Sequence, residues 1–348
     1  MSALRAGLIG CGAIGSRYDE GRSTDSPRAN APLYTHAGML SALPEFELVA
    51  IAEPDQQRRA ACRTAWGVPT AYAGHREMLA RERLDVLCLA TPDETHAALL
   101  ADILELARPC AIFTEKPLAA TASEARALGL RCEAAGVALL VDHVRRCDSN
   151  HLALRDFLSG SGLGPLRTVV GHYVRGIRHN GCQLVNLLRF FVGEPLCVQA
   201  FGLAQGSVAD DPSLDLRLVF ADGCTALVAA QDRAGYAYSL FETEFYGDRG
   251  RLRLDATGRD ISLELAEPYA EFPGFTRLAQ APSPWPKETY GAAMLRAGRE
   301  LARAASGQPL ELALGWREAA RDLEIIEAAL ASALAGGAEI AIPAPQGL

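Results

Sequence analysis

The sequence predicts an α/β domain of parallel strands and crossover helices, followed by an α+β domain that contains an antiparallel sheet. Short apolar runs alternate with helical segments over the first 145 residues, as they do where helices connect parallel strands. Beyond residue 150 apolar and polar residues alternate with period two, which is typical of antiparallel sheet. A chain of 348 residues suffices for about two domains, and we expect them at 1–145 and 146–348.

The first domain is expected to contain a series of buried strands. Most of them are apolar at successive positions, as strands covered on both faces must be. Helices are indicated at 95–107, by apolar residues at helical spacing, and at 123–135, by a Thr/Ser-rich start suited to capping. The predicted strands are residues 4–9, 47–52, 85–90, 110–114 and 137–141.

The second domain is expected to contain antiparallel hairpins. Asp222 and Gly223 lie between alternating segments at 215–220 and 224–230, and an Asp-Gly pair is a strong hairpin signal. Residues 316–334 are rich in Ala, Leu, Glu and Arg and should form a helix that ends at two glycines.

Composition and charge exclude several classes of protein. The chain carries 34 Lys and Arg against 42 Asp and Glu, a formal charge of -8, with no long basic run, so we expect no nucleic-acid partner. No signal peptide or membrane span is indicated, so we expect a cytoplasmic protein without a membrane partner. The nine cysteines include no C-x-x-C pair and should be reduced thiols. The seven histidines lack metal-motif spacing, so no metal site is expected.

A glycine motif follows the first predicted strand. Gly10, Gly12 and Gly15, with Ala13 and Ile14 between the last two, form G-x-G-x-x-G. In a dinucleotide-binding (Rossmann) domain the first glycine permits a tight turn, the second lets the backbone approach a pyrophosphate, and the third allows close helix–sheet packing. The pyrophosphate then lies at a helix N-terminus. We therefore expect these five residues to bind a dinucleotide.

Glu53 ends the second predicted strand, where an acidic residue binds the ribose hydroxyls. A carboxylate there should repel a 2′-phosphate, so NAD is favoured, while Arg58 and Arg59 nearby leave NADP as the alternative. Gly15 and Glu53 are 38 residues apart in the sequence, rather than about 20. The excess falls at 16–36, which we interpret as a loop inserted at the cofactor side of the sheet.

A lysine lies where the strand at 110–114 ends. Lys116 precedes Pro117 and emerges at the carboxyl end of the predicted parallel sheet, where open α/β sheets bind ligands. A lysine there can donate or accept a proton if burial lowers its pKa towards the operating pH. The alternative is a Lys-Pro surface turn.

Four motifs together resemble the glucose-fructose oxidoreductase/inositol dehydrogenase/MocA (Gfo/Idh/MocA) family. They are GCGAIG at 10–15, ATPDETH at 90–96, TEKP at 114–117 and NGCQLVNLLRFFVGEP at 180–195. The resemblance extends over nearly the whole chain. It implies a Rossmann domain, a C-terminal domain with a large open antiparallel sheet, and NAD(P)-dependent hydride transfer at a sugar, sugar-nucleotide or polyol carbon. It also implies a homodimer or homotetramer.

The resemblance further implies roles for single residues. Lys116 would bind the reacting hydroxyl or carbonyl oxygen and exchange its proton. Thr91, Pro92 and His96 would lie near the cofactor, and Glu115 near the nicotinamide ribose.

The histidine that carries the proton in many members of the family is replaced here. Gln183 stands at its position, and a glutamine can hydrogen-bond a substrate oxygen but cannot take its proton. One explanation is that Lys116 carries the proton while Gln183 orients the substrate. A second is that His179 acts from one helical turn earlier. The third is that Tyr173, His143 or water does so, or that no chemistry occurs.

The remaining candidates follow from strand ends and from the last motif. Asp142, Arg145 and Arg146 follow the strand at 137–141, and Arg145 or Arg146 could bind a phosphate or carboxylate of the substrate. The alternative is that the two arginines form salt bridges at the surface. The candidate catalytic residues are thus Lys116 and His179, and the candidate substrate residues are Lys116, Arg145, Tyr173, Asn180 and Gln183.

A rival interpretation follows from the same departures. Gln183 and Asn186, the latter in place of an aspartate, are also what we would expect of a cofactor-binding sensor or regulatory protein that has lost catalysis. Such a protein would bind the cofactor without turnover.

Overall fold

The structure is a computed structural model, which describes residues 3–21, 33–203, 210–232, 238–255, 258–285 and 290–345. It divides into two compact units, the first comprising 1–148 and 289–320 and the second 149–288 and 321–348. The first boundary lies close to the expected division at residue 145. Residues 289–320, however, belong to the first unit rather than the second, because the apolar face of a helix there packs into the core of the first unit.

The first unit contains a six-stranded sheet in the order β3-β2-β1-β4-β5-β6, and all neighbouring strands are parallel. This is the strand order of a doubly wound Rossmann fold. The five predicted strands are confirmed to within a residue or so at each end. β3, three residues long, is too short to have been predicted from a pattern. The strands are β1 (Leu4–Ile9), β2 (Phe46–Ala52), β3 (Thr70–Tyr72), β4 (Val86–Leu89), β5 (Ala111–Thr114) and β6 (Ala138–Val141).

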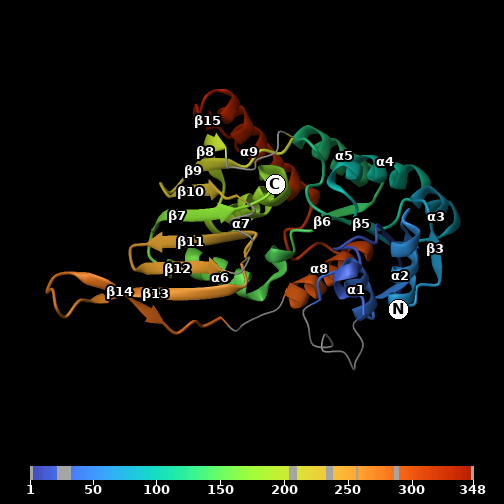
Figure 1. The fold of residues 1–348 in the computed structure, drawn as a ribbon, viewed down its shortest axis with the longest axis horizontal. Coiled ribbons are helices and arrows are strands. Elements are labelled where there is room, and N and C mark those ends of the chain that lie inside the picture. Colours follow the sequence, from blue (N-terminus) through green and yellow to red (C-terminus); the bar gives the residue numbers. More distant parts are fainter. Residues whose placement is uncertain are drawn as a thin grey trace. The chain divides into compact units, whose positions relative to one another are not determined.

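Helices cover both faces of this sheet. α1, α2 and α8 pack together on one face, and α3, α4 and α5 pack on the other (Figure 1). The two predicted helices correspond to α4 and α5. The bounds are α1 (His36–Ala42), α2 (Gln56–Trp66), α3 (His75–Arg81), α4 (His96–Leu106), α5 (Ala122–Ala134) and α8 (Tyr290–Ala305), with short 3₁₀ turns at Arg17–Asp19, Asp93–Thr95 and Val144–Cys147.

The helix expected directly after the glycine motif begins only at His36, because the inserted segment intervenes. The amides of His36 and Ala37 donate to the carbonyls of Ile14 (3.1 Å) and Gly15 (2.9 Å). α1 therefore continues from the glycine motif in space, although about twenty residues separate the two in sequence. The middle of the insertion, 22–32, lies outside the described residues.

The second unit contains a nine-stranded sheet in the order β14-β13-β12-β11-β7-β10-β9-β8-β15. Its neighbours are antiparallel except β7 and β10, which pair in parallel, so the expected antiparallel sheet is mixed at its centre. The β13–β14 hairpin extends beyond the other strands of this sheet (Figure 1). The strands are β7 (Leu166–Tyr173), β8 (Pro195–Leu203), β9 (Leu214–Phe220), β10 (Thr225–Ala230), β11 (Phe241–Gly247), β12 (Gly250–Asp255), β13 (Asp260–Pro268), β14 (Thr276–Ala281) and β15 (Ile340–Ala341).

The helices of the second unit form its core with one face of that sheet. α6 (Ser149–Ser159), α7 (Cys182–Val192) and the later part of α9 (Trp316–Leu334) contribute buried leucines, isoleucines and phenylalanines. The hairpin predicted at Asp222 and Gly223 is confirmed as β9 and β10, and the last predicted helix matches α9. Within the described residues no helix is long and apolar enough to span a membrane.

Candidate functional site

The glycine motif forms a tight turn with one open side. Gly10 has a φ of +93°, and a Cβ there would lie 2.4 Å from the carbonyl oxygen of Ala90. A Cβ on Gly15 would lie 2.1 Å from the oxygen of Gly10, whereas one on Gly12 would meet no atom within 4 Å. The outer two glycines are therefore required by packing, and the middle one leaves open space beside the backbone. The turn fits the pyrophosphate of a dinucleotide, which needs that close approach.

Glu53 lies beside this turn, as predicted from its place after β2. Its Oε2 accepts a hydrogen bond from the amide of Cys11 (2.8 Å), and its Oε1 accepts one from the amide of Asp55 (3.0 Å). The side chain of Arg59 donates to the backbone oxygens of Glu53 and Pro54. These bonds fix a carboxylate where a ribose-binding acid is expected.

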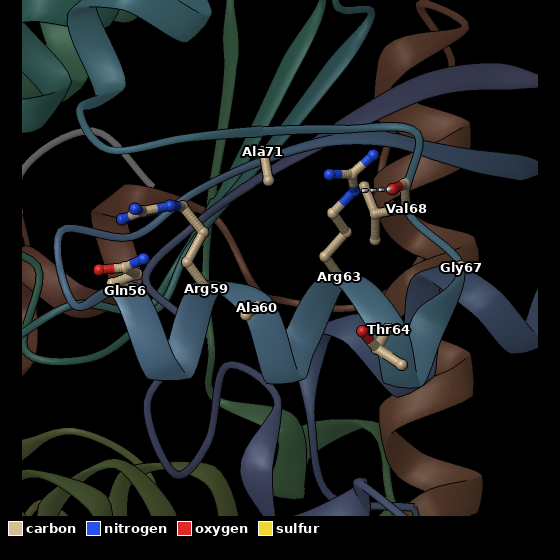
Figure 2. Close-up of a pocket in the computed structure, with 8 residues that line it drawn as sticks. All are labelled: Gln56, Arg59, Ala60, Arg63, Thr64, Gly67, Val68 and Ala71. Carbon is tan, nitrogen blue, oxygen red and sulfur yellow. Dashed lines mark hydrogen bonds between the residues drawn. The ribbon is translucent and has the colours of Figure 1, made fainter.

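A separate open pocket lies between α2 and the segment that leads into β3 (Figure 2). Its volume is about 610 Å³. Arg59 and Arg63 extend from α2 into it, and Arg63 donates to the backbone oxygen of Val68. No residue of the glycine motif is among those lining it, so this pocket is not the expected dinucleotide site. The lining residues are Gln56, Arg59, Ala60, Arg63, Thr64, Gly67, Val68 and Ala71.

His96 connects the two loops that follow β4 and β5. Its ring is fully buried, with Nε2 3.0 Å from the carbonyl oxygen of Thr91 and Nδ1 2.8 Å from that of Pro117. Thr91 in turn accepts a hydrogen bond from the hydroxyl of Thr95. His96 therefore holds the loop that contains Pro92 against the loop that contains Lys116.

Lys116 emerges after β5 next to a cluster of ionisable side chains. Nε2 of His36 lies 3.0 Å from Oε1 of Glu115 and 3.9 Å from Oδ2 of Asp142. The amide of Val144 donates to Asp142 Oδ1. Sequence reasoning did not connect His36 with the site, because only folding brings the start of α1 to the ends of β5 and β6.

Burial and mutual repulsion separate the pKa values of the two carboxyl groups. Burial favours a high pKa for Glu115, but the hydrogen bond from His36 and the charges of His36 and Lys116 outweigh it and hold the pKa at about 2. Burial and the charge of Glu115 raise the pKa of Asp142 to about 7. Burial alone would lower the pKa of His36, but hydrogen bonding to Cys88 and Glu115 outweighs it and raises the pKa. At neutral pH an imidazolium, a carboxylate and a half-titrated carboxyl group lie together.

Three atoms of this cluster, one each from His36, Glu115 and Asp142, lie within 4.8 Å of one another. Histidine and carboxylate atoms at this spacing also occur around metal ions. The direct hydrogen bond between His36 and Glu115, and the charge of Lys116 beside it, favour the sharing of protons instead.

Tyr290, at the start of α8, joins the cluster and was not predicted. Burial, together with the charge of Asp142, raises its pKa well above the ordinary value. The guanidinium of Arg145 lies 5.8 Å from the centre of its ring, and Tyr34 stacks on it at 5.5 Å. Arg145 thus lies over the aromatic residue that borders the cluster.

In the second unit, the motif expected to bind substrate begins with a π-helical turn, Gly176–Gly181, that leads into α7. The carboxylate of Asp211 accepts hydrogen bonds from the backbone amides of Arg178 (2.8 Å) and His179 (2.9 Å). The amide of Gly176 donates to the hydroxyl of Ser213. π-helical turns are rare and occur frequently at functional sites, so the turn supports the choice of this segment as a candidate site, in addition to the motif.

The predicted residues of the second unit have different environments. The hydroxyl of Tyr173 is buried and bonded to both the amide and the carbonyl of Leu214, so Tyr173 serves the core. Asn180 is buried, and its Nδ2 has no hydrogen-bond partner among the described residues. His179 lies within the π-helical turn and Gln183 in the first turn of α7, and both are half-buried. Among these four residues, Asn180 is thus the one with a buried N–H donor that is available to a ligand.

The first unit matches a known family model. Residues 4–143 match the Gfo/Idh/MocA model, described as an oxidoreductase family with an NAD-binding Rossmann fold. The uncharacterized oxidoreductase YdgJ of Escherichia coli is 26% identical over 49% of this chain and 43% of its own length. D-xylose 1-dehydrogenase (NADP(+)) 2 of Haloferax volcanii is 27% identical over 58% of this chain and 65% of its own. The chain therefore spans less than two thirds of either relative.

A longer match and the solved structures extend the likeness. Inositol 2-dehydrogenase of Rhizobium meliloti is 26% identical over 76% of this chain and 78% of its own length. A putative myo-inositol dehydrogenase from Sinorhizobium meliloti has a TM-score of 0.73 at 22% identity, covering 98% of this chain and 100% of that one. Levoglucosan dehydrogenase in complex with NADH and levoglucosan has a TM-score of 0.73 at 19% identity, with 98% and 100% covered. With the glycine turn and the Rossmann sheet, these findings show that residues 4–143 form an NAD-binding Rossmann domain of the Gfo/Idh/MocA type, and that the chain as a whole shares the fold of the solved dehydrogenases.

Proposed function

We propose that this chain is an NAD-dependent dehydrogenase or reductase that transfers a hydride between the nicotinamide and a hydroxyl or keto carbon of a sugar, sugar nucleotide or polyol. The observation that carries the proposal is Lys116, which follows β5 at the same edge of the sheet as the glycine turn. When bound, the nicotinamide supplies the hydride acceptor or donor. The names of the inositol, xylose and levoglucosan dehydrogenases support the substrate class.

The residues of this chain have separate tasks in that reaction. The glycine turn at 10–15 binds the pyrophosphate, and Glu53 binds the adenosine ribose and disfavours a 2′-phosphate, so NAD is the expected cofactor. Lys116 binds the reacting oxygen and exchanges its proton. Asn180 and Gln183 hydrogen-bond the substrate, and Gln183 orients it without taking a proton.

Location and assembly are part of the same proposal. We expect a cytoplasmic enzyme that assembles as a homodimer or homotetramer through its nine-stranded sheet. Size-exclusion chromatography with light scattering tests the assembly, and a monomer at working concentration would contradict it.

Nicotinamide absorbance tests whether the chain is an enzyme. Purified protein is incubated with NAD or NADP, in both redox states, and with free sugars, nucleotide-linked sugars, polyols and keto-sugars. Turnover with NAD and a member of one class supports the proposal and identifies the substrate. Cofactor binding without turnover across the panel would instead support a sensor that keeps the cofactor site, as Gln183 and Asn186 suggest.

A further inference from the structure

Three ionisable side chains meet beside Lys116 from three elements of the first unit. His36 begins α1, Glu115 follows β5 and Asp142 follows β6. The side chains of His36 and Asp142 are 0% and 2% exposed, and that of Glu115 is 12% exposed. Two carboxyl groups buried this close together cannot both ionise without a large cost, so one of them tends to retain a proton.

The surroundings of Asp142 determine which carboxyl group keeps the proton. Glu115 faces it from the end of β5, His36 from α1, Tyr290 from α8, and Cys147 from the 3₁₀ turn that follows β6, while Arg145 of that turn acts on Tyr290. The anion of Glu115 is the nearest like charge. Among the positive charges, that of His36 acts on both carboxyl groups.

The charge of Lys116 acts mainly on Glu115. Glu115 therefore stays ionised near neutral pH, and Asp142 is the member whose charge changes there. Titration near neutral pH is what a proton-transferring group requires.

We propose that His36, Glu115 and Asp142 form a proton-storing cluster for Lys116, with Asp142 as the site where the proton resides. The proposal rests on the proposed function and names its proton acceptor. It accounts for a chain in which Gln183 cannot take the proton: the acceptor lies in the first unit, next to Lys116.

The step balances in the oxidative direction. An N–H bond of the Lys116 ammonium breaks first, and the proton passes through the carboxylate of Glu115 to form an O–H bond at the carboxylate of Asp142. The O–H bond of the substrate then breaks and its proton forms a new N–H bond at Nζ, while the hydride leaves the carbon with its electron pair for the nicotinamide. Asp142 ends protonated, Glu115 and Lys116 regain their starting states, and reduction runs the same path backwards.

Infrared difference spectroscopy on the full chain tests the cluster without requiring turnover. The wild type should lose the C=O band of one protonated carboxyl group as the pH rises through about 7, and Asp142→Asn should lack that band. Asp102→Asn is the matched control, because Asp102 pairs with His75 at 2.7 Å outside the site and its replacement should leave the band unchanged. A band that persists in Asp142→Asn, or a wild type without such a titration, would overturn the proposal.

A second variant tests the cluster independently, in case Asp142→Asn does not fold. His36→Asn keeps both carboxyl groups but removes the cation that favours their ionised forms, so the midpoint of the titration should move to higher pH. An unchanged midpoint would show that His36 is not part of the cluster.

Kinetics separate this proposal from the proposed function. In Asp142→Asn kcat should fall about a hundredfold near pH 7, the corresponding limb of the pH profile should disappear, and the Kd for NAD should stay within about twofold. Unchanged kcat and pH profile would refute the storage role while leaving the dehydrogenase intact. If the wild type turns over no substrate, the proposed function fails, and the infrared titration still decides whether the cluster exists.

Discussion

Nε2 of His36 lies 3.0 Å from Oε1 of Glu115, although 79 residues separate the two in sequence. The contact depends on where α1 begins, and α1 begins at His36 because the preceding insertion returns to the glycine motif. Oδ2 of Asp19 accepts hydrogen bonds from the amides of Tyr34 and Thr35 and from the hydroxyl of Thr35, at 2.7 to 2.8 Å. Asp19 thereby closes the insertion and sets the position of the imidazole.

Replacement of Asp19 by alanine should therefore destabilise the first unit. The change leaves three buried or half-buried donors without their acceptor, which should cost about 1–3 kcal/mol of unfolding free energy. Urea denaturation measures it. Glu47→Ala, at an exposed position of β2, is the control and should change the stability by less than about 0.5 kcal/mol. Equal stability of Asp19→Ala and wild type would show that the insertion does not need this carboxylate.

Two glycines of the motif should respond differently to alanine. A Cβ on Gly15 would lie 2.1 Å from the oxygen of Gly10, so Gly15→Ala should lower the melting temperature. A Cβ on Gly12 would meet nothing within 4 Å, so Gly12→Ala should melt like the wild type yet bind NAD at least about tenfold more weakly, since the methyl group occupies the space of the pyrophosphate. Unchanged NAD affinity in Gly12→Ala would place the cofactor elsewhere.

The pH dependence of stability should reveal Asp142. Its pKa in the folded state is about 7, above the unfolded value of about 3.9, so between these values the folded chain binds more protons than the unfolded chain. Its contribution to stability is therefore fully present below pH about 4 and is lost as the pH rises through about 7. Denaturant unfolding at a series of pH values should show that the free energy of unfolding of Asp142→Asn rises relative to that of the wild type between pH about 4 and about 7. Parallel curves would contradict the raised pKa.

Glu115 has the opposite effect on the pH dependence of stability, in a more acidic pH range. Its pKa of about 2 lies below the unfolded value of about 4.3, so its contribution is present above that value and is lost as the pH falls towards about 2. The loss of stability that Asp142 causes should therefore be measured only above pH about 5, where the contribution of Glu115 no longer changes with pH.

Tyr173 and Asn180 should separate stability from substrate binding. Tyr173→Phe removes a hydroxyl bonded to both backbone groups of Leu214, which should cost about 1–3 kcal/mol of stability with KM unchanged. Asn180→Ala removes an amide whose Nδ2 has no partner among the described residues, so it should raise KM several-fold and change stability by less than about 1 kcal/mol. A raised KM in Tyr173→Phe, or an unchanged one in Asn180→Ala, would reverse these roles.

Much of the fold could be predicted from local pattern. Strands buried on both faces are apolar at most successive positions, which located β1 and β5, and the Asp222-Gly223 turn located a hairpin. The parallel pairing of β7 with β10 could not be predicted, because it depends on which distant strands meet. The same holds for residues 289–320, whose core contacts with the first unit lie far away in sequence.

The site was predictable where it lies at strand ends. Glu53 and Asp142 directly follow β2 and β6, Lys116 lies two residues after β5, and the carboxyl ends of parallel strands meet at one edge of the sheet. The cluster also needs His36 and Tyr290, which carry no motif and reach it only through the closure of the insertion and the packing of α8. The return of a helical pattern just after the inserted segment was the one signal that could have indicated His36.

The measurement that tests the account most directly is the kinetics of Lys116→Met with the substrate found by the panel. The side chain keeps its length but loses the group that binds the reacting oxygen, so kcat should fall about 10²- to 10⁴-fold while the Kd for NAD stays the same. Arg131→Met, at an exposed position of α5, is the matched control and should keep wild-type kinetics. If Lys116→Met folds, binds NAD and turns over at the wild-type rate, Lys116 is not at the reacting oxygen, and the account fails.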